Sequence, residues 1–560
     1  MKDDIRAAIN KALTALGVEE VSFVVDFPTE KTSGADYFSN VAMVVAKKMG
    51  KSPVEVAEMI RDTFWMQAVT SVDVAGPGFL NFYIDRTWYT KQLENILNDE
   101  ENWGKGVSQK GEVVLVEYTS PNLFKPLHVG NLVGNIVGEA LTRLFEFEGA
   151  TVKRLNYPSD IGLTVAKAVW GLMQTGGNPE DINQLGEAYR FGNDAYENDE
   201  AAKVNIVEVN HALYSGSDDE IMTLRAKGIA TSKGQLDLIC TRLGTKFDAV
   251  IYESEAADLG IKTVKGNIGR VFEESEGAIV YKGEKIGLHT RVFLNSKGLP
   301  TYEAKDLGNF ALKQELFPDW TTSLIVTGSE QTEYFKVLYA AIRELFPQID
   351  ATHLNLEHVP TGFLTLTTGK MSSRKGNVLT GESLLADMEE SAREKAAGTR
   401  TDNIDELTEQ VAVAALKYQI LRQAVGSNIV FDKERALSFE GDSGPYLQYT
   451  HARILSVLEK AKSLGIHSSV DVAPEKTFEV QKVLSRFPAV TETALWERSP
   501  HKVATYLTEL AAAFNTFYAH EKIADVSDEY RNYKTAVTKA VGVTLKKGLW
   551  ILGIKAPERM

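Results

Sequence analysis

The spacing of apolar residues predicts a small mixed unit at the beginning of the chain. Apolar positions recur at helical intervals over residues 39–49 and 53–66. Ser52 stands immediately before a proline, which is typical of the residue that begins a helix. Residues 71–84 instead indicate two strands, separated by a Gly-Pro-Gly turn. We therefore expect a small N-terminal α+β domain over residues 1–110.

From residue 111 onward the pattern changes to strand–helix–strand order. One helix is predicted between the first two strands, up to about residue 147, and another over residues 331–346. The predicted strands cover residues 113–118, 151–156, 323–328 and 363–368. Alternation of this kind is typical of a parallel sheet covered by helices. The fold class predicted for residues 111–405 is therefore α/β, with a Rossmann-like parallel sheet.

Two further regions differ from this sheet domain. Residues 173–290 are polar and acidic, and we interpret much of this range as an insertion into the sheet domain. After residue 405 helical spacing replaces the strand patterns, which predicts an all-α helix bundle over residues 406–560. The predicted helices cover residues 406–426, 446–464, 478–496, 501–521 and 530–553.

Composition limits the classes of protein that remain. The 560 residues include 61 Lys plus Arg and 76 Asp plus Glu, a net charge of −15, which argues only weakly against a nucleic-acid partner. The single Cys240 excludes a disulfide framework and a cysteine-based zinc site, and the histidines lack metal-ligand spacing, so no protein-bound metal is expected. The polar start and the lack of a long apolar run predict a cytoplasmic protein without a membrane segment.

Residues 117–138 have the features of a phosphate site at a helix start. A strand ends near Tyr118, and Pro126 suits the first turn of the following helix, where its missing N–H costs nothing. His128 falls in the same turn and shares a face with Asn131, so both side chains can point at one ligand. The free N–H groups and partial positive charge of a helix start favour phosphate.

Glycine recurs at every fourth position of this helix, at Gly130, Gly134 and Gly138. Three glycines cost a helix about 3 kcal/mol relative to alanine, so the close approach of another group should offset the loss. Tight packing explains Gly138, whereas Gly130 stands next to His128 and is the better candidate for a ligand contact.

A second basic segment follows the predicted strand 363–368. Residues 369–377 combine cations, hydroxyls and glycines, and such a loop can close on a triphosphate and follow its charge as it leaves. The candidate ATP-binding residues here are Lys370, Met371, Ser372, Ser373, Arg374 and Lys375. Alone, the loop is equally well interpreted as a solvated basic turn, and the helix start at His128 makes the phosphate interpretation much stronger.

Together the two segments resemble the HIGH and KMSKS signatures of class I aminoacyl-tRNA synthetases, and their surroundings resemble arginyl-tRNA synthetases in particular. The resemblance covers nearly the whole chain, including residues 71–83, 442–454 and 552–560. In two places the sequence departs from the signatures. Asn131 replaces the second histidine of HIGH, and the second lysine of KMSKS is displaced. In this family a lysine just before HIGH is thought to compensate, and Lys125 stands there.

The resemblance implies ATP-dependent attachment of L-arginine to tRNA(Arg) through an arginyl-adenylate, with release of pyrophosphate and AMP. ATP would bring Mg²⁺, held by phosphate oxygens and waters, and no protein-bound zinc is implied. The catalytic and ATP-binding residues implied on the helix side are Lys125, His128, Gly130 and Asn131. A monomer is also implied by the resemblance.

The resemblance also assigns an arginine site. The implied arginine-binding residues are Glu117, Asn122, Tyr302, Asp306 and Gln331. Tyr302 and Asp306 are four residues apart and would bind the guanidinium from one helical face, while Glu117 would pair with the α-ammonium. Tyr334 stands where many members have histidine. Without the resemblance, ordinary structural roles are the better interpretation of Glu117 and Gln331.

Contacts with tRNA are expected in two regions. Phe79 and Asn81 alternate along a predicted strand, and by resemblance they read a base of the D-loop, although a core position competes as an explanation of Phe79. Residues 531–560 contain seven Lys or Arg and one acid, and this basic end is a candidate phosphate-tracking face. Arg559 and Met560 are the tRNA-binding residues implied there.

Two other interpretations stay open. A catalytically weak homologue that acts as a tRNA-binding protein is compatible with Asn131, although Lys125, His128 and the loop cations are intact. The second interpretation is an enzyme that attaches a different amino acid to tRNA. The acidic Asp306 disfavours apolar substrates, and the missing Cys/His cluster disfavours a zinc-dependent cysteine pocket.

Overall fold

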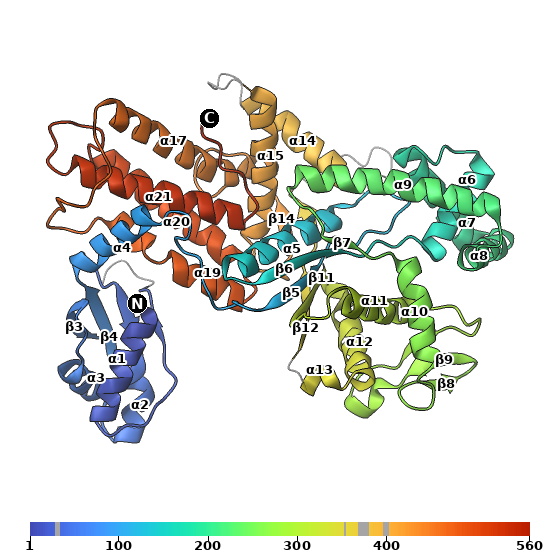
Figure 1. Ribbon diagram of the computed structural model, residues 1–560, viewed down its shortest axis with the longest axis horizontal. Helices are drawn as coiled ribbons and strands as arrows, with labels where there is room; N and C mark the ends of the chain where they lie inside the picture. Colours follow the sequence, from blue (N-terminus) through green and yellow to red (C-terminus); the bar gives the residue numbers. More distant parts are fainter. Residues whose placement is uncertain (29–33, 352–353, 368–379, 396–402) are drawn as a thin grey trace. The chain divides into compact units, whose positions relative to one another are not determined.

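The computed structural model describes residues 1–28, 34–351, 354–367, 380–395 and 403–560. They form two units, each assembled from three stretches of the chain (Figure 1). The first unit comprises Met1–Gly104, Arg453–Ala489 and Glu509–Thr544, and the second comprises Lys105–Ala452, Val490–Thr508 and Leu545–Met560.

The first unit contains a four-stranded antiparallel sheet with the order β1–β2–β4–β3. Its strands are β1 (Val25–Asp26), β2 (Tyr37–Ser39), β3 (Val69–Ala75) and β4 (Phe79–Ile84), and its first helices are α1 (Lys2–Ala15), α2 (Val41–Met49), α3 (Pro53–Thr63) and α4 (Arg86–Asn98). Leu80 and Phe82 of β4 are fully buried in a core with Ile5 and Val41. The helices predicted over 39–49 and 53–66 and the two strands within 71–84 are confirmed.

The cap predicted at Ser52 is confirmed as well. Glu55 N–H donates to Ser52 Oγ (3.3 Å), and Ser52 N–H donates to the Glu55 carboxylate (2.8 Å). Pro53 occupies the first helical position, where no intrahelical N–H is lost. Gly78 has a φ of +114°, and a Cβ there would lie 2.8 Å from the Pro53 backbone, so the turn between β3 and β4 requires glycine.

The helices after residue 440 correspond closely to the predicted bundle. They are α17 (Gly444–Ser463), α18 (Glu479–Leu484), α19 (Phe487–Trp496), α20 (His501–His520) and α21 (Arg531–Ile551). One helix was expected over 478–496, but α18 and α19 are separate. The break at Ser485 and Arg486 lies just before Pro488, whose ring prevents the preceding helix from continuing.

The second unit contains a five-stranded parallel sheet with the order β12–β11–β5–β6–β7. Its strands are β5 (Val113–Glu117), β6 (Thr151–Asn156), β7 (Ala249–Val250), β11 (Thr322–Gly328) and β12 (Asn355–Thr361). The strand order reverses between β5 and β11, and ligand sites of open parallel sheets lie beyond the carboxyl ends of strands at such a reversal. The predicted α/β class with a Rossmann-like sheet is confirmed.

Helices cover both faces of this sheet. Leu115 and Ile325 share a buried core with Leu307 of α11 (Tyr302–Leu316) and Leu338 of α12 (Thr332–Leu345). Because side chains alternate along a strand, the buried Val116 points to the other face. The long helix α5 (Val129–Phe147) contacts β5, β6 and β11 there.

One sheet prediction is wrong in part. The predicted strand over 363–368 exists as β13 (Leu364–Leu366), but it pairs with β14 (Ile429–Phe431) in a separate two-stranded sheet. The fifth position of the main sheet belongs to β12, which the sequence pattern missed. β12 is an edge strand that contains Glu357, His358 and Pro360, so it lacks the apolar run of a central strand.

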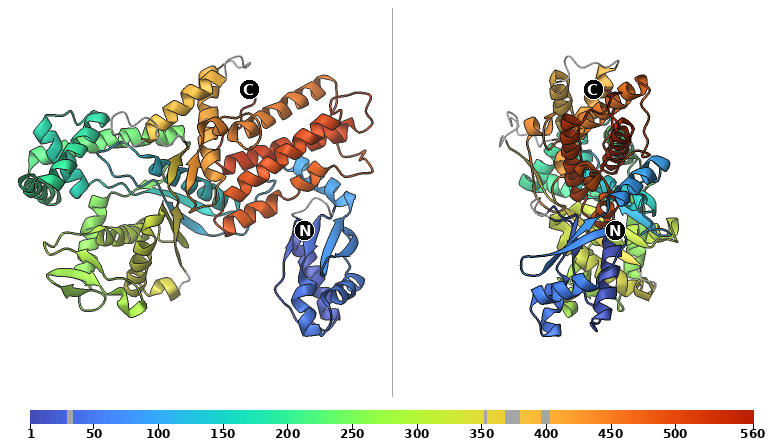
Figure 2. Two further views of the ribbon diagram at one scale, coloured as in Figure 1. Left: turned by 180° about the vertical axis from the view of Figure 1, so that it is seen from behind. Right: turned by 90° about the vertical axis from the view of Figure 1, so that its left-hand side faces the viewer.

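The region between β6 and α11 contains two groups of elements rather than one continuous insertion (Figures 1 and 2). Helices α6 (Leu163–Thr175), α7 (Ile182–Asn198), α8 (Glu200–Ser215) and α9 (Asp219–Arg242) share one buried core. The chain then returns to the main sheet at β7. The second group consists of α10 (Glu253–Lys265) and an antiparallel sheet of β8 (Glu273–Ser275), β9 (Ala278–Tyr281) and β10 (Arg291–Leu294).

The remaining elements of the second unit are short connections or lie beside α5. The connections are the 3₁₀ turns η2 (Gly283–Ile286) and η3 (Ser329–Gln331), and the short helices α13 (Gln348–Ala351) and α16 (Lys433–Ala436). Helices α14 (Gly381–Lys395) and α15 (Ile404–Leu421) contact each other and α5.

The packing role assigned to Gly138 gives a test of the fold. A Cβ at Gly138 would lie 2.4 Å from Cγ of the buried Tyr118, so Gly138→Ala should lower stability by about 1–3 kcal/mol through overpacking. Thermal unfolding measures this change. Gly234→Ala is the matched control, because nothing lies within 4 Å of that position in α9 and the added methyl should raise helix stability by about 1 kcal/mol. Equal midpoints for Gly138→Ala and the unchanged chain would contradict this packing.

Candidate active site

The turn that follows β5 has a strained backbone. Thr119, Ser120 and Phe124 have φ values of +74°, +21° and +66°, and they are three of the five non-glycine residues with positive φ in the described part of the chain. Such conformations cost of order 1–3 kcal/mol each and persist where surrounding contacts impose them. The strain therefore marks this turn, at the carboxyl end of the central strand, as a candidate functional position.

Two asparagines of α5 hold the strained turn in place. Asn131 Nδ2 donates to the Thr119 carbonyl (3.0 Å), and Asn135 Nδ2 donates to Thr119 Oγ1 (3.0 Å). Asn131 Oδ1 also accepts from His128 N–H (3.2 Å). The side chain predicted to meet phosphate is thus already engaged on both polar atoms, and its amide has one further N–H to offer.

Helix α5 begins later than the sequence pattern indicated. His128 is the N-cap, Val129 is the first helical residue, and Pro126 precedes the helix, so the expectation that Pro126 and His128 lie in the first turn is wrong. The reason is the Asn131 side chain, which caps the free N–H of His128 and stabilises a start at Val129. The free N–H groups of the first turn still point outward from this end.

The imidazole of His128 lies over Gly130. A Cβ at Gly130 would be 2.9 Å from His128 Nδ1, so the missing side chain makes room for the ring. Partial burial and the positive charge of Lys125 lower the pKa of His128 below its ordinary value, and Glu330 opposes them. His128 is therefore neutral at pH 7 and can donate one N–H.

Lys125 lies beside the same helix start. Its Nζ is 5.0 Å from the ring centroid of Tyr189, and burial lowers its pKa below the ordinary value. A bound anion would favour the charged form and oppose this shift.

The predicted loop residues Lys370, Met371, Ser372, Ser373, Arg374 and Lys375 lie outside the described residues. The chain that follows them is described. Thr380 forms an antiparallel bridge with His128, and Gly381 N–H donates to the Leu127 carbonyl (2.7 Å). A segment more than 250 positions away in the sequence is thus paired directly with the helix start.

A cluster of carboxylates, formed by Asp306 of α11 with Glu117 and Glu253, lies beside α11. Tyr334 OH donates to Asp306 Oδ2 (2.5 Å). Burial raises the pKa of Asp306 to about 7, the Tyr334 hydrogen bond lowers it, and the charges of Glu117 and Glu253 raise it. A cation placed here would restore the ionised form of Asp306. Tyr302 is more than half exposed at the start of α11, with Lys305 Nζ 4.4 Å from its ring centroid.

Two buried lysines partly neutralise the negative charge of this carboxylate cluster. Glu117 Oε2 accepts from Lys313 Nζ (2.5 Å) and from Asn309 Nδ2 (2.9 Å). Glu253 accepts from Lys305 Nζ in a short contact and from Ser159 Oγ (2.8 Å). The carboxylate assigned to the α-ammonium of the substrate is therefore already paired within the protein, and a ligand would share it.

Sequence reasoning missed Glu253, Asn309 and Lys313. Asn309 and Lys313 stand three and seven residues after Asp306, so helical spacing from that residue was the signal that could have found them. Glu253 follows β7, and no local pattern connects it with α11. Tyr157 was missed as well: its buried hydroxyl has no hydrogen-bond partner in the structure.

The other predicted site residues lie around the same edge of the sheet. Gln331 is the N-cap of α12, immediately after β11. Asn122 bridges to Ser159 at the end of β6. The turn after β6 is stabilised by Asp160, which accepts from Ser254 N–H (2.9 Å) and Ser254 Oγ (2.7 Å) and pairs with Arg225.

The predicted tRNA contacts fall on both units. In the first unit, Phe79 and Asn81 share the face of β4 that points away from the core, where Phe79 packs edge-on against Phe38 (5.7 Å), so the core explanation of Phe79 is wrong. In the second unit, Arg559 is exposed and Met560 is partly buried.

Part of the basic end is engaged in ion pairs. Lys534 is buried with Glu521 (2.6 Å) and Asp528 (2.7 Å), and Lys539 pairs with Glu100 (2.6 Å). These two lysines are therefore less suited to phosphate than the sequence suggested.

Two features are absent from the described residues. No group of three or more His, Cys, Asp or Glu among them could hold a metal ion. No helix in the described part of the chain is long and apolar enough to span a membrane.

A helix start with an N-cap histidine, directly after the central strand of a doubly wound sheet, is the arrangement expected of class I aminoacyl-tRNA synthetases. Sequence comparison agrees. The family "tRNA synthetases class I (R), catalytic domain" matches residues 92–433. "Arginyl tRNA synthetase N terminal domain" matches residues 1–84, and "DALR anticodon binding domain" matches residues 447–560.

Full-length relatives identify the family more narrowly. The arginine–tRNA ligases of Limosilactobacillus reuteri and Streptococcus pneumoniae are each 30% identical, over 577 and 580 residues, and the match covers 100% of both chains in each case. The Thermus thermophilus arginyl-tRNA synthetase structure has a TM-score of 0.82 at 25% identity over 100% of both chains. The Plasmodium falciparum enzyme shares the fold, with a TM-score of 0.81 at 21% identity over 100% of this chain and 99% of that one. The chain belongs to the arginyl-tRNA synthetase family.

Proposed function

We propose that this chain attaches L-arginine to tRNA(Arg) in an ATP-dependent reaction. Arginine and ATP form arginyl-adenylate and pyrophosphate, and the terminal ribose hydroxyl of the tRNA then takes the arginyl group and releases AMP. The observation that carries the proposal is the Asp306 carboxylate, whose pKa burial raises to about 7 beside the charges of Glu117 and Glu253. The start of α5 at His128 supplies the second half of the proposed site.

The arrangement suits a reaction that depends on placement and electrostatics. The arginine carboxylate is itself the nucleophile, so no strong general base is needed, and the barrier lies in charge that builds on the α-phosphate. The free N–H groups at the start of α5, neutral His128 and the Lys125 ammonium supply donors and positive charge at that point. The loop residues Lys370, Arg374 and Lys375 are proposed to add further charge. Mg²⁺ enters with ATP as part of the substrate.

The carboxylate cluster beside α11 suits a guanidinium. Asp306 offers two carboxylate oxygens in the geometry of a planar fork, whereas the ammonium of lysine is a single point charge. The hydrogen bond from Tyr334 leaves the other oxygen, Oδ1, available. Gln331, Asn122 and Tyr302 are proposed to complete the arginine site.

The anticodon-binding match over residues 447–560 supports tRNA as the partner. Phe79, Asn81, Arg559 and Met560 are proposed to contact it. A cytoplasmic, monomeric protein remains our prediction.

A catalytically weak tRNA-binding homologue is the second candidate. One observation favours it: Asn131 stands at the position of a signature histidine, and its amide is already held by Thr119 and His128. Retained Lys125 and His128 favour the enzyme.

Charging of total tRNA with each labelled amino acid, with and without ATP, distinguishes the two. We expect ATP-dependent labelling with arginine and much less with lysine. Binding of tRNA without labelling by any amino acid would instead establish the weak homologue. Labelling with a different amino acid would overturn the role given to Asp306.

The pKa of Asp306 predicts how arginine affinity depends on pH. Above pH 7 the carboxylate is ionised and can pair with the guanidinium, whereas below pH 7 it takes up a proton and the attraction is lost. The KM for arginine should therefore rise about tenfold per pH unit below 7 and level off above it. Steady-state charging from pH 5.5 to 8.5 measures this dependence.

Asp306→Asn is the matched variant for this experiment. The neutral amide should raise the KM for arginine about 100-fold and remove its pH dependence, with a much smaller effect on the KM for ATP. A pH profile unchanged by Asp306→Asn would show that a different group titrates.

A further inference from the structure

The end of α21 and the residues that follow it are held at their backbone by side chains from three helices of the second unit. Their carbonyls are the acceptors. The contacts are Arg143 Nη1 to Trp550 O (2.9 Å), Lys417 Nζ to Gly553 O (2.6 Å), Gln448 Nε2 to Lys555 O (2.8 Å) and His451 Nδ1 to Pro557 O (3.2 Å). Residues 550–557, which we call the C-terminal segment, therefore have a position imposed by α5, α15 and α17.

Two of these cations also hold the end of α9. Arg143 Nη2 donates to Gly244 O (3.2 Å), and Lys417 Nζ donates to Leu243 O (2.6 Å). Carbonyls at helix ends lack intrahelical partners and lie at the negative end of the helix dipole, so they suit cations. Arg143 and Lys417 thus bridge the same two segments in parallel, and we call this pair the two-cation clasp.

The clasp depends on the seating of both segments, because each segment supplies one of the two carbonyls that Lys417 binds. Lys417 is 1% exposed, and its hydrogen bonds in the described structure go to these two carbonyls. Burial lowers its pKa to about 7. A Cβ at Gly553 would lie 2.7 Å from Lys417 Nζ, so the segment passes close over the lysine. A buried ammonium that lost one carbonyl would be strongly destabilised.

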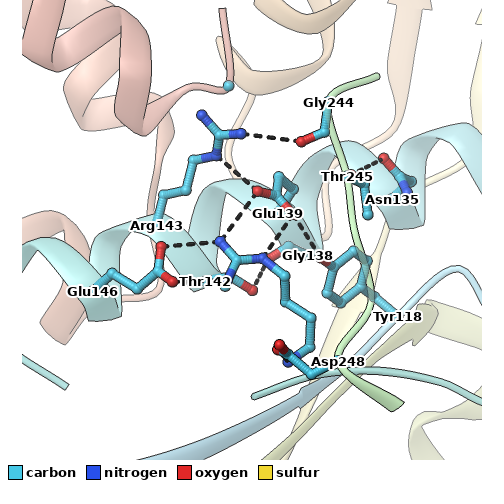
Figure 3. Close-up of polar contacts among 12 residues, drawn as sticks. Tyr118, Asn135, Gly138, Glu139, Thr142, Arg143, Glu146, Gly244, Thr245 and Asp248 are labelled. Atoms are coloured by element: carbon cyan, nitrogen blue, oxygen red, sulfur yellow. Dashed lines mark hydrogen bonds and ion pairs between the residues drawn. The ribbon is translucent and has the colours of Figure 1, made fainter. Parts of the chain in front are cut away.

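Arg143 links the clasp to the strained turn of the active site. Its Nε donates to Glu139 Oε1 (2.7 Å), and Glu139 Oε2 accepts from Tyr118 OH (2.6 Å), as Figure 3 shows. Burial alone would raise the pKa of Glu139, but Arg143, Arg154 and Tyr118 outweigh it and lower the pKa, so the carboxylate is ionised. Tyr118 stands between Glu117 of the arginine pocket and the strained Thr119.

A second connection starts from the same end of α9. Thr245 Oγ1 donates to Asn135 Oδ1 (3.1 Å; Figure 3). Asn135 Nδ2 in turn donates to Thr119 Oγ1 (3.0 Å). Both connections therefore reach the turn after β5, one at Tyr118 and the other at Thr119.

We propose that Arg143 is a positioning residue, through which the seating of the C-terminal segment sets the geometry of the turn after β5 and hence the turnover of the enzyme. The inference rests on the proposed function. A cavity of about 810 Å³ lies beside the clasp and is lined by Arg143, Gly553 and Arg559. Since Arg559 is a proposed tRNA contact, tRNA bound there would seat the segment and so favour the catalytic geometry.

Kinetics of the full-length chain separate this role from simple stabilisation. Arg143→Lys keeps a positive charge near Glu139 but cannot hold Glu139, Gly244 and Trp550 together. We expect kcat to fall about 5- to 30-fold, while the KM for arginine and ATP and the affinity for tRNA, measured by direct binding, change less than about threefold. Thr142→Ala is the matched control on the same helix, because the buried Thr142 hydroxyl donates to Gly138 O (2.8 Å) and is not a partner of Glu139, Gly244 or Trp550. It should lower the unfolding midpoint while kcat stays within about twofold.

Gly553→Ala perturbs the clasp from its other side, without a change to α5. Gly553→Ala should lower kcat as Arg143→Lys does. If Arg143→Lys does not fold, the kcat of Gly553→Ala alone tests the positioning role. An unchanged kcat in the folded variants, with loss of thermal stability alone, would overturn the positioning role. Failure of the unchanged chain to charge tRNA would overturn the proposed function instead, so the two failures are distinguishable.

Discussion

The attachment of the strained turn after β5 to helix α5 is the constraint on which the rest of the site depends. Asn131 and Asn135 hold Thr119, and Glu139 holds Tyr118. The helix can lie this close to the strand because Gly138 has no side chain beside the Tyr118 ring. The same helix presents its free N–H groups at His128. One rigid element therefore fixes both the strand end near the proposed arginine site and the helix start proposed to meet phosphate.

Electrostatics divide the site into two regions. Around His128 the helix start and Lys125 favour anions. Beside α11, burial and the charges of Glu117 and Glu253 raise the pKa of Asp306 to about 7, and this group of carboxylates favours a cation. Arginine carries both a carboxylate and a guanidinium, so it can span the two regions with each end in a favourable field. Lys305 and Lys313 pair with Glu253 and Glu117 and so offset part of the negative charge near Asp306, which itself accepts a hydrogen bond from Tyr334.

Local patterns predicted most of the elements, because helix and strand periodicity depend on neighbouring residues. These predictions failed where contacts between distant segments determine the structure. The edge strand β12 lacks an apolar run, and the start of α5 is set by the Asn131 side chain. Asp306 and Tyr302 were proposed from spacing and resemblance. The position of Glu253 and the bond between Arg143 and Trp550, 407 positions apart, arise from folding across distant segments. The resemblance could assign Asn131 a role at phosphate, but only the fold shows what its amide already holds.

One ligand is proposed to join the two regions, with its guanidinium at Asp306 and its phosphate at the start of α5. A crystal structure of the full-length chain with a non-hydrolysable arginyl-adenylate analogue tests it most directly. We predict guanidinium nitrogens about 2.7–3.2 Å from the Asp306 carboxylate, with the phosphate mimic against the first turn of α5 beside His128. An analogue bound with its guanidinium away from α11, or with its phosphate mimic away from α5, would contradict the account.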